Sequence, residues 1–256
     1  SGEYLDGKIY AYTATWYQAP KEFIVIDPVT WTVTEEHSND DYYVLDMAYD
    51  YSTQTMYGLE PGGEDEVNLM RIDLTTGAPS VIGGLGQVVR AIACDREGKL
   101  FGMSGNGTLL RIDPLTAQTT AVGDTGFGDV IYLQSMAFDH NTGRLFWAAT
   151  SENVMGDIYE VDPFTAECQY YGSTMFNGDE PSELVCLHTP YTHIPDGVSA
   201  AGKDSAAISA SVNAHGEAAV TTPGDASVKV FDALGSTVYS RSVAAGTSRF
   251  TLGLGS

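Results

Sequence analysis

One pattern of short apolar runs and turns recurs four times in the first 188 residues, and this repetition limits the fold more than any other feature of the sequence. In the clearest copy the four runs are residues 90–95, 99–103, 109–112 and 118–123. Related copies occupy residues 46–83, 135–172 and, starting partway into the pattern, 7–28. The copies recur about every 45 residues, a length that suits a unit of four short strands.

Two kinds of turn separate the runs in each copy. An Asp-x-x-x-Gly turn, as at 139–143, lies between the first and second strands, A and B, and its glycine can adopt a positive φ. An Asp-Pro-x-Thr turn, as at 113–116, lies between strands C and D, where Asp accepts backbone N–H bonds and Pro presets φ. The recurring aspartates could instead ligate a cation, but their position where the chain reverses favours capping. We therefore expect an all-β fold, a β-propeller of four-stranded blades.

The first copy begins at the second strand, so we expect it to lack strand A. The segment Leu184–His188, which follows the fourth copy, reads as a lone strand A. If it pairs with the first copy, the ring closes by strand exchange and leaves no open sheet edge. The alternative is that further blades precede this sequence and that the ring is larger.

The rest of the chain has a different character. Residues 189–206 are rich in Pro, Gly, Ser, Ala and Asp without an apolar period, which predicts a linker. Residues 207–256 carry short alternating runs separated by turns, which predicts a small Ig-like β-sandwich. The sequence thus predicts a propeller at 1–188, a linker at 189–206 and a C-terminal domain at 207–256.

Two segments of the tail, Val228–Tyr239 and Phe250–Leu254, follow a V-x-V-[YF]-[DN]-x-x-G-x-x-V pattern and a strand that ends near Leu. In this the tail resembles the C-terminal sorting domain of the type IX secretion system of Bacteroidetes-type bacteria. The resemblance implies export by that machinery to the medium or the cell surface. The family's final Gly-Val-Tyr strand is missing here, so we expect the sheet to lack its last strand. The blades resemble quinoprotein-like and YVTN-type repeats, which implies architecture and not activity.

Charge and motifs narrow the function. The chain carries 34 Asp and Glu against 12 Lys and Arg, a net charge of -22, which disfavours nucleic acid and anionic lipid as partners. It has no apolar run of the roughly 18 residues that a membrane-spanning helix needs, so we expect no membrane insertion. No nucleophile elbow, phosphate loop or His-Glu-x-x-His motif is present, and the five histidines share no ligand spacing. We therefore assign no catalytic or metal-binding residue and no cofactor, with Ca²⁺ kept open because carboxylates are plentiful.

In a propeller the D–A and B–C loops gather on one face, and here these loops interleave aromatic and acidic residues, as carbohydrate-binding surfaces do. The candidate ligand-binding residues on this loop face are Trp16, Tyr17, Tyr42, Tyr43, Phe127, Tyr132, Phe176 and Asp179. The residues expected to line the channel are Asp46, Arg90, Gln134 and Glu183, whose mixed charge favours an internal network over a pocket.

These observations favour a non-catalytic binding or adhesion module, secreted or on the cell surface, whose loop face holds a glycan or a protein. A propeller enzyme that acts on polysaccharide is the first alternative. A structural spacer that presents the tail to the secretion machinery is the second.

Overall fold

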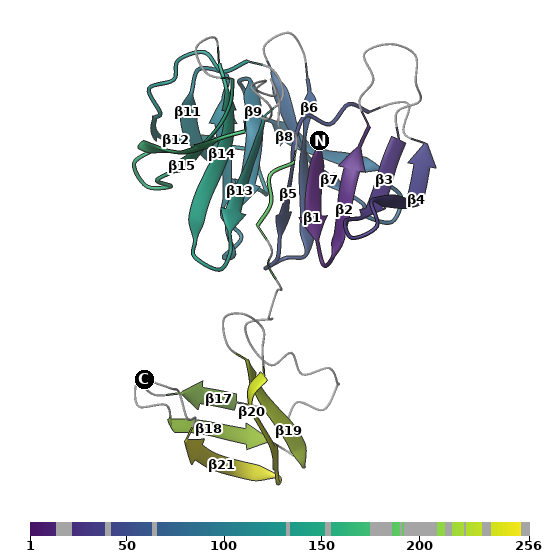
Figure 1. Cartoon of the computed structure of the whole chain (residues 1–256), viewed down its shortest axis with the longest axis vertical. Coiled ribbons are helices and arrows are strands. Elements are labelled where there is room, and N and C mark those ends of the chain that lie inside the picture. The colour runs from purple at the N-terminus through teal and green to yellow at the C-terminus, as the bar shows by residue number, and fades with distance from the viewer. Residues whose placement is uncertain are drawn as a thin grey trace. The chain divides into compact units, whose positions relative to one another are not determined.

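The computed structural model describes most of the chain (Figure 1). The described residues are 1–13, 22–38, 42–62, 66–131, 134–151, 155–174, 186–189, 191, 209–212, 217–222, 224–231 and 237–251. The chain divides into two compact units, Ser1–Tyr191 and Thr192–Ser256, which are described separately below. The first unit extends past the predicted propeller boundary at residue 188 to Tyr191.

The first unit consists of four antiparallel sheets, each with four strands in sequence order. Blade 1 contains β1 (Gly2–Leu5), β2 (Lys8–Tyr12), β3 (Glu22–Asp27) and β4 (Thr32–Ser38). Blade 2 contains β5 (Met47–Asp50), β6 (Thr55–Pro61), β7 (Val67–Ile72) and β8 (Pro79–Gly84). Blade 3 contains β9 (Val89–Cys94), β10 (Leu100–Ser104), β11 (Thr108–Ile112) and β12 (Thr119–Asp124). Blade 4 contains β13 (Ser135–Asp139), β14 (Arg144–Thr150), β15 (Met155–Val161) and β16 (Cys168–Ser173).

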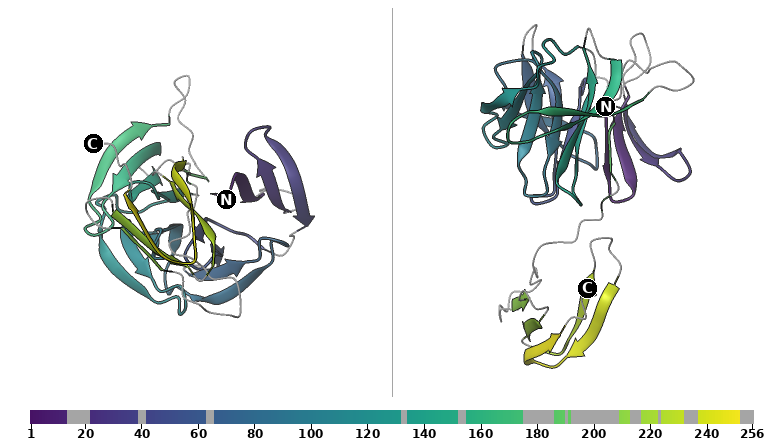
Figure 2. Two further views of the ribbon diagram at one scale, coloured as in Figure 1. Left: turned by 90° about the horizontal axis from the view of Figure 1, so that it is seen from below. Right: turned by 60° about the vertical axis from the view of Figure 1, so that its left-hand side comes forward.

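The four sheets stand around a common axis as the blades of a propeller (Figure 2), which confirms the predicted fold. The first strand of each blade is innermost, and β1 packs against β5, β5 against β9, and β9 against β13. Three apolar cores fill the spaces between successive blades. Among the fully buried side chains of these cores are Phe23 and Met47 between blades 1 and 2, Leu69 and Ile92 between blades 2 and 3, and Met103 and Trp147 between blades 3 and 4.

The expectation that the first copy lacks strand A is wrong. Strand β1 occupies that position and pairs with β2 from Gly2–Ala11 to Leu5–Lys8. A two-residue turn joins the strands, with φ of 49° at Asp6 and 82° at Gly7, the left-handed pair of a type I′ hairpin. The polar Glu3 interrupts the apolar run, so the sequence marked this strand only by the Asp6-Gly7 dipeptide of its hairpin turn.

The predicted strand exchange is not seen in the described part of the chain. Residues 186–189 form no strand, whereas Leu184 and Val185 lie outside the described residues. The segment Cys186–Thr189 instead contacts both the last and the first blade. The N–H of Leu187 donates to Ser135 Oγ in β13 at 3.1 Å, and the His188 ring stacks on Tyr4 of β1 with centroids 3.8 Å apart. The segment therefore lies between the innermost strands of blades 4 and 1 without extending either sheet.

The C–D turns are capped as predicted, including that of blade 2, which reads Asp73-Leu74-Thr75-Thr76 where the other three read Asp-Pro-x-Thr. In each blade the first aspartate accepts, on Oδ1, the N–H of the residue two positions later, at 2.7 or 2.8 Å; the aspartates are Asp27, Asp73, Asp113 and Asp162. The residue four positions after each aspartate has a positive φ and donates its N–H to the aspartate carbonyl; these residues are Trp31, Gly77, Ala117 and Ala166. The backbone N–H bonds lower the pKa of the Asp27, Asp73 and Asp113 carboxyls.

The A–B turns are capped in the same way. Asp50 accepts the N–H of Ser52 at 2.8 Å, Asp95 that of Glu97 at 3.0 Å and Asp139 that of Asn141 at 3.0 Å. These aspartates therefore hold turns, as the sequence indicated.

Among its described residues, the second unit has five strands in two sheets. Strands β17 (Ser209–Val212), β18 (Glu217–Thr222) and β21 (Gly246–Thr251) form one sheet, and β19 (Ala226–Phe231) and β20 (Thr237–Val243) form the other. Val220 and Phe250 of the first sheet and Val243 of the second share a small core, and Tyr239 stacks on Phe250 with centroids 4.9 Å apart. The tail is thus a small all-β unit with apolar side chains between its sheets.

Candidate functional site

Three of the eight residues predicted to bind ligand lie in the described part of the chain, and two of these three contribute to packing. Phe127 makes edge contacts with Trp147 and Tyr159, with centroids 5.0 and 4.7 Å apart, and belongs to the core between blades 3 and 4. Tyr43 packs against the core between blades 2 and 3, and Tyr42 is half-buried. The other five lie outside the described residues: Trp16, Tyr17, Tyr132, Phe176 and Asp179.

Among the predicted channel residues, Asp46 bonds to the innermost strand of blade 3. It is fully buried, and its Oδ2 accepts the N–H of Ile92 in β9 at 2.8 Å. Burial raises the pKa of this carboxyl well above its ordinary value, while the amides of Ile92, Met47 and Met136 oppose the rise. The carboxyl thus links blade 2 to blade 3 through the Ile92 hydrogen bond, and its Oδ1 is buried without a hydrogen-bond partner among the described residues.

Gln134 and Arg90 also lie within the propeller interior. Gln134 is fully buried; its amide donates to the carbonyl of Ile131 at 2.8 Å and to that of Thr150, and its Oε1 accepts the Trp147 indole N–H at 2.7 Å. Arg90 is half-buried in β9, and its Nε is buried without a hydrogen-bond partner. Glu183 lies outside the described residues.

Sequence reasoning missed a second interior carboxyl, Glu3 of β1. The residue exposes an intermediate part of its surface, but its carboxyl faces inward, and burial together with the nearby Asp46 raises its pKa well above the ordinary value. The N–H of Tyr4 donates to Glu3 Oε1 at 3.1 Å and opposes this rise. Its place in the innermost strand could have identified it, but the sequence analysis did not recognise that strand.

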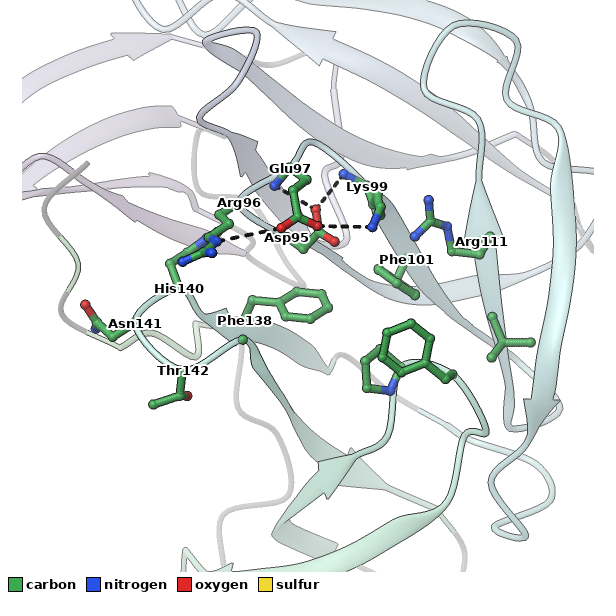
Figure 3. Close-up of a pocket in the computed structure, with 14 residues that line it drawn as sticks. Asp95, Arg96, Glu97, Lys99, Phe101, Arg111, Phe138, His140, Asn141 and Thr142 are labelled. Carbon is green, nitrogen blue, oxygen red and sulfur yellow. Dashed lines mark hydrogen bonds and ion pairs between the residues drawn. The ribbon is translucent and has the colours of Figure 1, made fainter. Parts of the chain in front are cut away.

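A pocket of about 630 Å³ lies between blades 3 and 4 (Figure 3). It is lined by the A–B turns of both blades, by the C–D turn of blade 4 and by side chains of the strands between them: Asp95, Arg96, Glu97, Lys99, Phe101, Arg111, Val122, Phe138, His140, Asn141, Thr142, Gly143, Pro163 and Phe164. In an antiparallel blade the A–B and C–D turns lie at the opposite ends of the strands from the B–C and D–A loops. The pocket therefore opens on the face opposite to the predicted loop face.

Aromatic rings form the floor and one wall of this pocket. The buried rings of Phe101 and Phe138 lie 5.3 Å apart between centroids, and the Arg111 guanidinium carbon lies 4.4 Å above the Phe101 ring (Figure 3). Phe164 is at the tip of the blade 4 C–D turn and is 83% exposed. The proline before it and the cap by Asp162 hold the turn, so this ring is held toward solvent by the backbone.

At the rim of the pocket, some of the described charged side chains are paired and one is not. Glu97 pairs with Lys99 at 3.0 Å and with Arg96 at 3.7 Å, and Asp95 accepts the N–H groups of Glu97 and Lys99. Lys99 lowers the pKa of the Glu97 carboxyl by hydrogen bonding and by its charge. Arg111 forms no ion pair with a carboxylate among the described residues. The pocket thus contains a half-buried cation, Arg111, that no carboxylate of the described residues neutralises by an ion pair.

Within the described ranges, no group of three or more His, Cys, Asp or Glu side chains is placed to hold a metal ion. No helix in the same part of the chain has the length and apolarity needed to cross a bilayer.

Neither a protein-family model nor a curated protein matches the chain. Solved structures do resemble it. TolB from Acinetobacter baumannii is 15% identical with a TM-score of 0.46, over 64% of this chain and 41% of TolB. A chain of a nidogen/laminin complex is 13% identical with a TM-score of 0.49, over 84% of this chain and 70% of that one.

An engineered GH43 glycoside hydrolase is 12% identical with a TM-score of 0.49, over 69% of this chain and 41% of the hydrolase. The chain thus spans less than half of TolB and of the hydrolase. Likenesses this distant carry no argument about ligand or activity. The blades themselves, with their order, pairing and repeated turns, identify the chain as a β-propeller protein.

Proposed function

We propose that the propeller is a non-catalytic binding module and that the pocket between blades 3 and 4 holds its ligand, a glycan or a segment of a protein. The observation that carries this proposal is the composition of the pocket. An exposed ring at Phe164 and the Arg111 cation, which pairs with no carboxylate among the described residues, lie around a floor of buried rings. Exposed aromatic rings and desolvated cations are the groups that contribute most to binding free energy at recognition sites.

The rim carboxylates suit binding better than proton transfer. A polysaccharide-cleaving enzyme needs one carboxylic acid that stays protonated beside the scissile bond. Glu97 has the opposite property, because Lys99 lowers its pKa and keeps it ionised. Asp95 accepts two backbone N–H groups of its own turn, which holds it in a structural role.

Phe164→Ala tests the proposal, with Leu115→Ala as its matched control. Leu115 has the same place in the blade 3 turn and is 73% exposed, but it does not line the pocket. On a panel of immobilised neutral and acidic polysaccharides and unfolded proteins, we expect the wild type to be retained on at least one member. Phe164→Ala should weaken that retention about tenfold, as the loss of one stacked ring costs roughly 1–2 kcal/mol, and Leu115→Ala should not change it.

Retention that Phe164→Ala leaves unchanged would place the ligand elsewhere, for example on the predicted loop face. A wild type that is retained on no member would contradict the binding proposal and favour the structural spacer.

A polysaccharide-cleaving enzyme is the second candidate, because the raised pKa values of Glu3 and Asp46 are the property that a general acid requires. Against it, Asp46 is fully buried and bonded to a backbone amide, and neither residue lines the pocket described above. Release of reducing ends from the same panel that is abolished by Glu3→Gln would favour the enzyme.

We also propose, from the resemblance of the tail alone, that the chain is exported by a type IX secretion system and acts in the medium or at the cell surface. The test expresses the chain with and without residues 207–256 in a bacterium that has this system. Export that requires the tail is the expected result, and retention of the full chain inside the cell would contradict it.

A further inference from the structure

We infer that the pocket between blades 3 and 4 recognises a sugar residue that carries a carboxylate, with the carboxylate bound by Arg111 and the sugar ring packed against Phe164. This inference rests on the proposed binding function and names the ligand class of that same site.

The position of Arg111 is the first reason. Its guanidinium carbon lies over a ring, 4.4 Å from the Phe101 centroid, and this cation–π contact holds the guanidinium at the pocket before a ligand arrives. A guanidinium presents parallel N–H groups whose spacing matches the two oxygens of a carboxylate. Because no described carboxylate pairs with Arg111, these donors are available to a ligand.

The charge around the pocket is the second reason. Three cations, Arg96, Lys99 and Arg111, line it together with only two carboxylates, Asp95 and Glu97. Both carboxylates already accept hydrogen bonds or ion pairs from their own turn. In a chain with a net charge of -22, this is a local reversal of sign, and it favours an anionic group at the pocket.

The same net charge limits the size of the ligand. A long polyanion would extend over acidic surface and be repelled, whereas a single carboxylate inside the pocket would be screened from most of it, since the screening length is about 8 Å at physiological ionic strength. A neutral ring that carries one carboxylate therefore fits better than nucleic acid or a phosphate polymer.

The aromatic wall is the third reason. Phe164 is 83% exposed at the tip of a capped turn, and Val122 and Pro163 add further apolar surface to the pocket. A pyranose ring has C–H groups on its faces that pack against an aromatic ring such as Phe164.

Calorimetric titration with trigalacturonate and with its trimethyl ester tests the inference, because the two ligands share the same sugar rings and differ in whether their carboxyl groups are charged or methylated. Arg111→Met removes the cation and keeps an apolar stem over Phe101. Arg71→Met is the matched control, because Arg71 has the same position in β7 of blade 2 and does not line this pocket. The expected result is that trigalacturonate binds the wild type and Arg71→Met equally and at least tenfold more tightly than it binds Arg111→Met, and that the ester binds all three proteins weakly.

Equal affinity for the acid and its ester, or an Arg111→Met affinity equal to that of the wild type, would overturn the inference. If the protein is nevertheless retained on a neutral polysaccharide of the panel and this retention depends on Phe164, the binding function still stands. If the wild type binds neither the trisaccharide nor any panel member, both the inference and the binding function fail.

Discussion

At the scale of single residues, the repeated turns determine where the backbone is strained. Each C–D turn places one residue in the left-handed region, and only blade 2 has glycine there, as Gly77. The A–B turns show the same contrast. Blade 4 has Gly143 four positions after its aspartate, with φ of 75°, whereas blade 2 has the exposed Gln54 at φ of 56°. A side chain in this region costs about 1–2 kcal/mol relative to the right-handed helical region.

We predict that Gln54→Gly stabilises the propeller. Relief of the left-handed strain should exceed the roughly 0.5–1 kcal/mol of backbone entropy that glycine loses on folding, for a net gain of about 0.5–1 kcal/mol. Gln54→Ala is the control, since it shortens the side chain and keeps the strain. Urea unfolding of the three proteins checks this, and equal midpoints for Gln54→Gly and Gln54→Ala would show that the backbone at this turn is not strained.

At the scale of elements, buried polar side chains link the inner strands of neighbouring blades. The sequence predicted some of these residues but not their partners. Asp46, predicted to line the channel, is fully buried and accepts the N–H of Ile92 in β9 of the next blade. Such contacts depend on how neighbouring strands are staggered, which no single copy of the repeat contains. The carboxyl is buried with a raised pKa, so its proton should affect stability.

We predict that Asp46→Asn flattens the pH dependence of stability. A carboxyl whose folded-state pKa is raised stabilises the fold below its unfolded pKa, near 4, and this contribution is lost as pH rises through the folded value. The wild type should therefore lose up to about 1.4 kcal/mol per pH unit from this group between these two values. Asparagine keeps an oxygen for the Ile92 N–H and does not titrate in this range.

Urea unfolding from pH 4 to pH 8 provides the comparison. The free energy of unfolding of Asp46→Asn relative to the wild type should rise with pH. Parallel curves for the two proteins would show that Asp46 titrates alike in the folded and unfolded states.

At the scale of the whole molecule, the sequence predicted the architecture because blades are local. The four strands of a blade and both kinds of turn lie within about 45 consecutive residues, so Asp113-Pro114 and Asp139 could be assigned from their own neighbourhood. Strand β1 was missed because Glu3 broke its apolar run, although Asp6-Gly7 marked the hairpin.

The pocket could not be predicted in this way. Arg111 and Phe101 come from blade 3, while Phe138 and Phe164 come from blade 4, and they meet because two blades pack face to face. The period assigns each residue to a blade and a strand, but it does not show which side chains the next blade places opposite them. The loop face was chosen for its aromatic residues, and Phe127 shows the weakness of that criterion, since its ring completes a core.

The most direct test of the central claim, that the ligand site lies between blades 3 and 4 on the turn face, is the map of backbone amide shifts on titration with trigalacturonate. The account predicts the largest shifts at residues 95–101, 111, 138–143 and 162–164, which line the pocket or flank its lining residues. Largest shifts at Tyr42, Tyr43 and the other D–A and B–C loop residues, with the pocket residues unmoved, would contradict it.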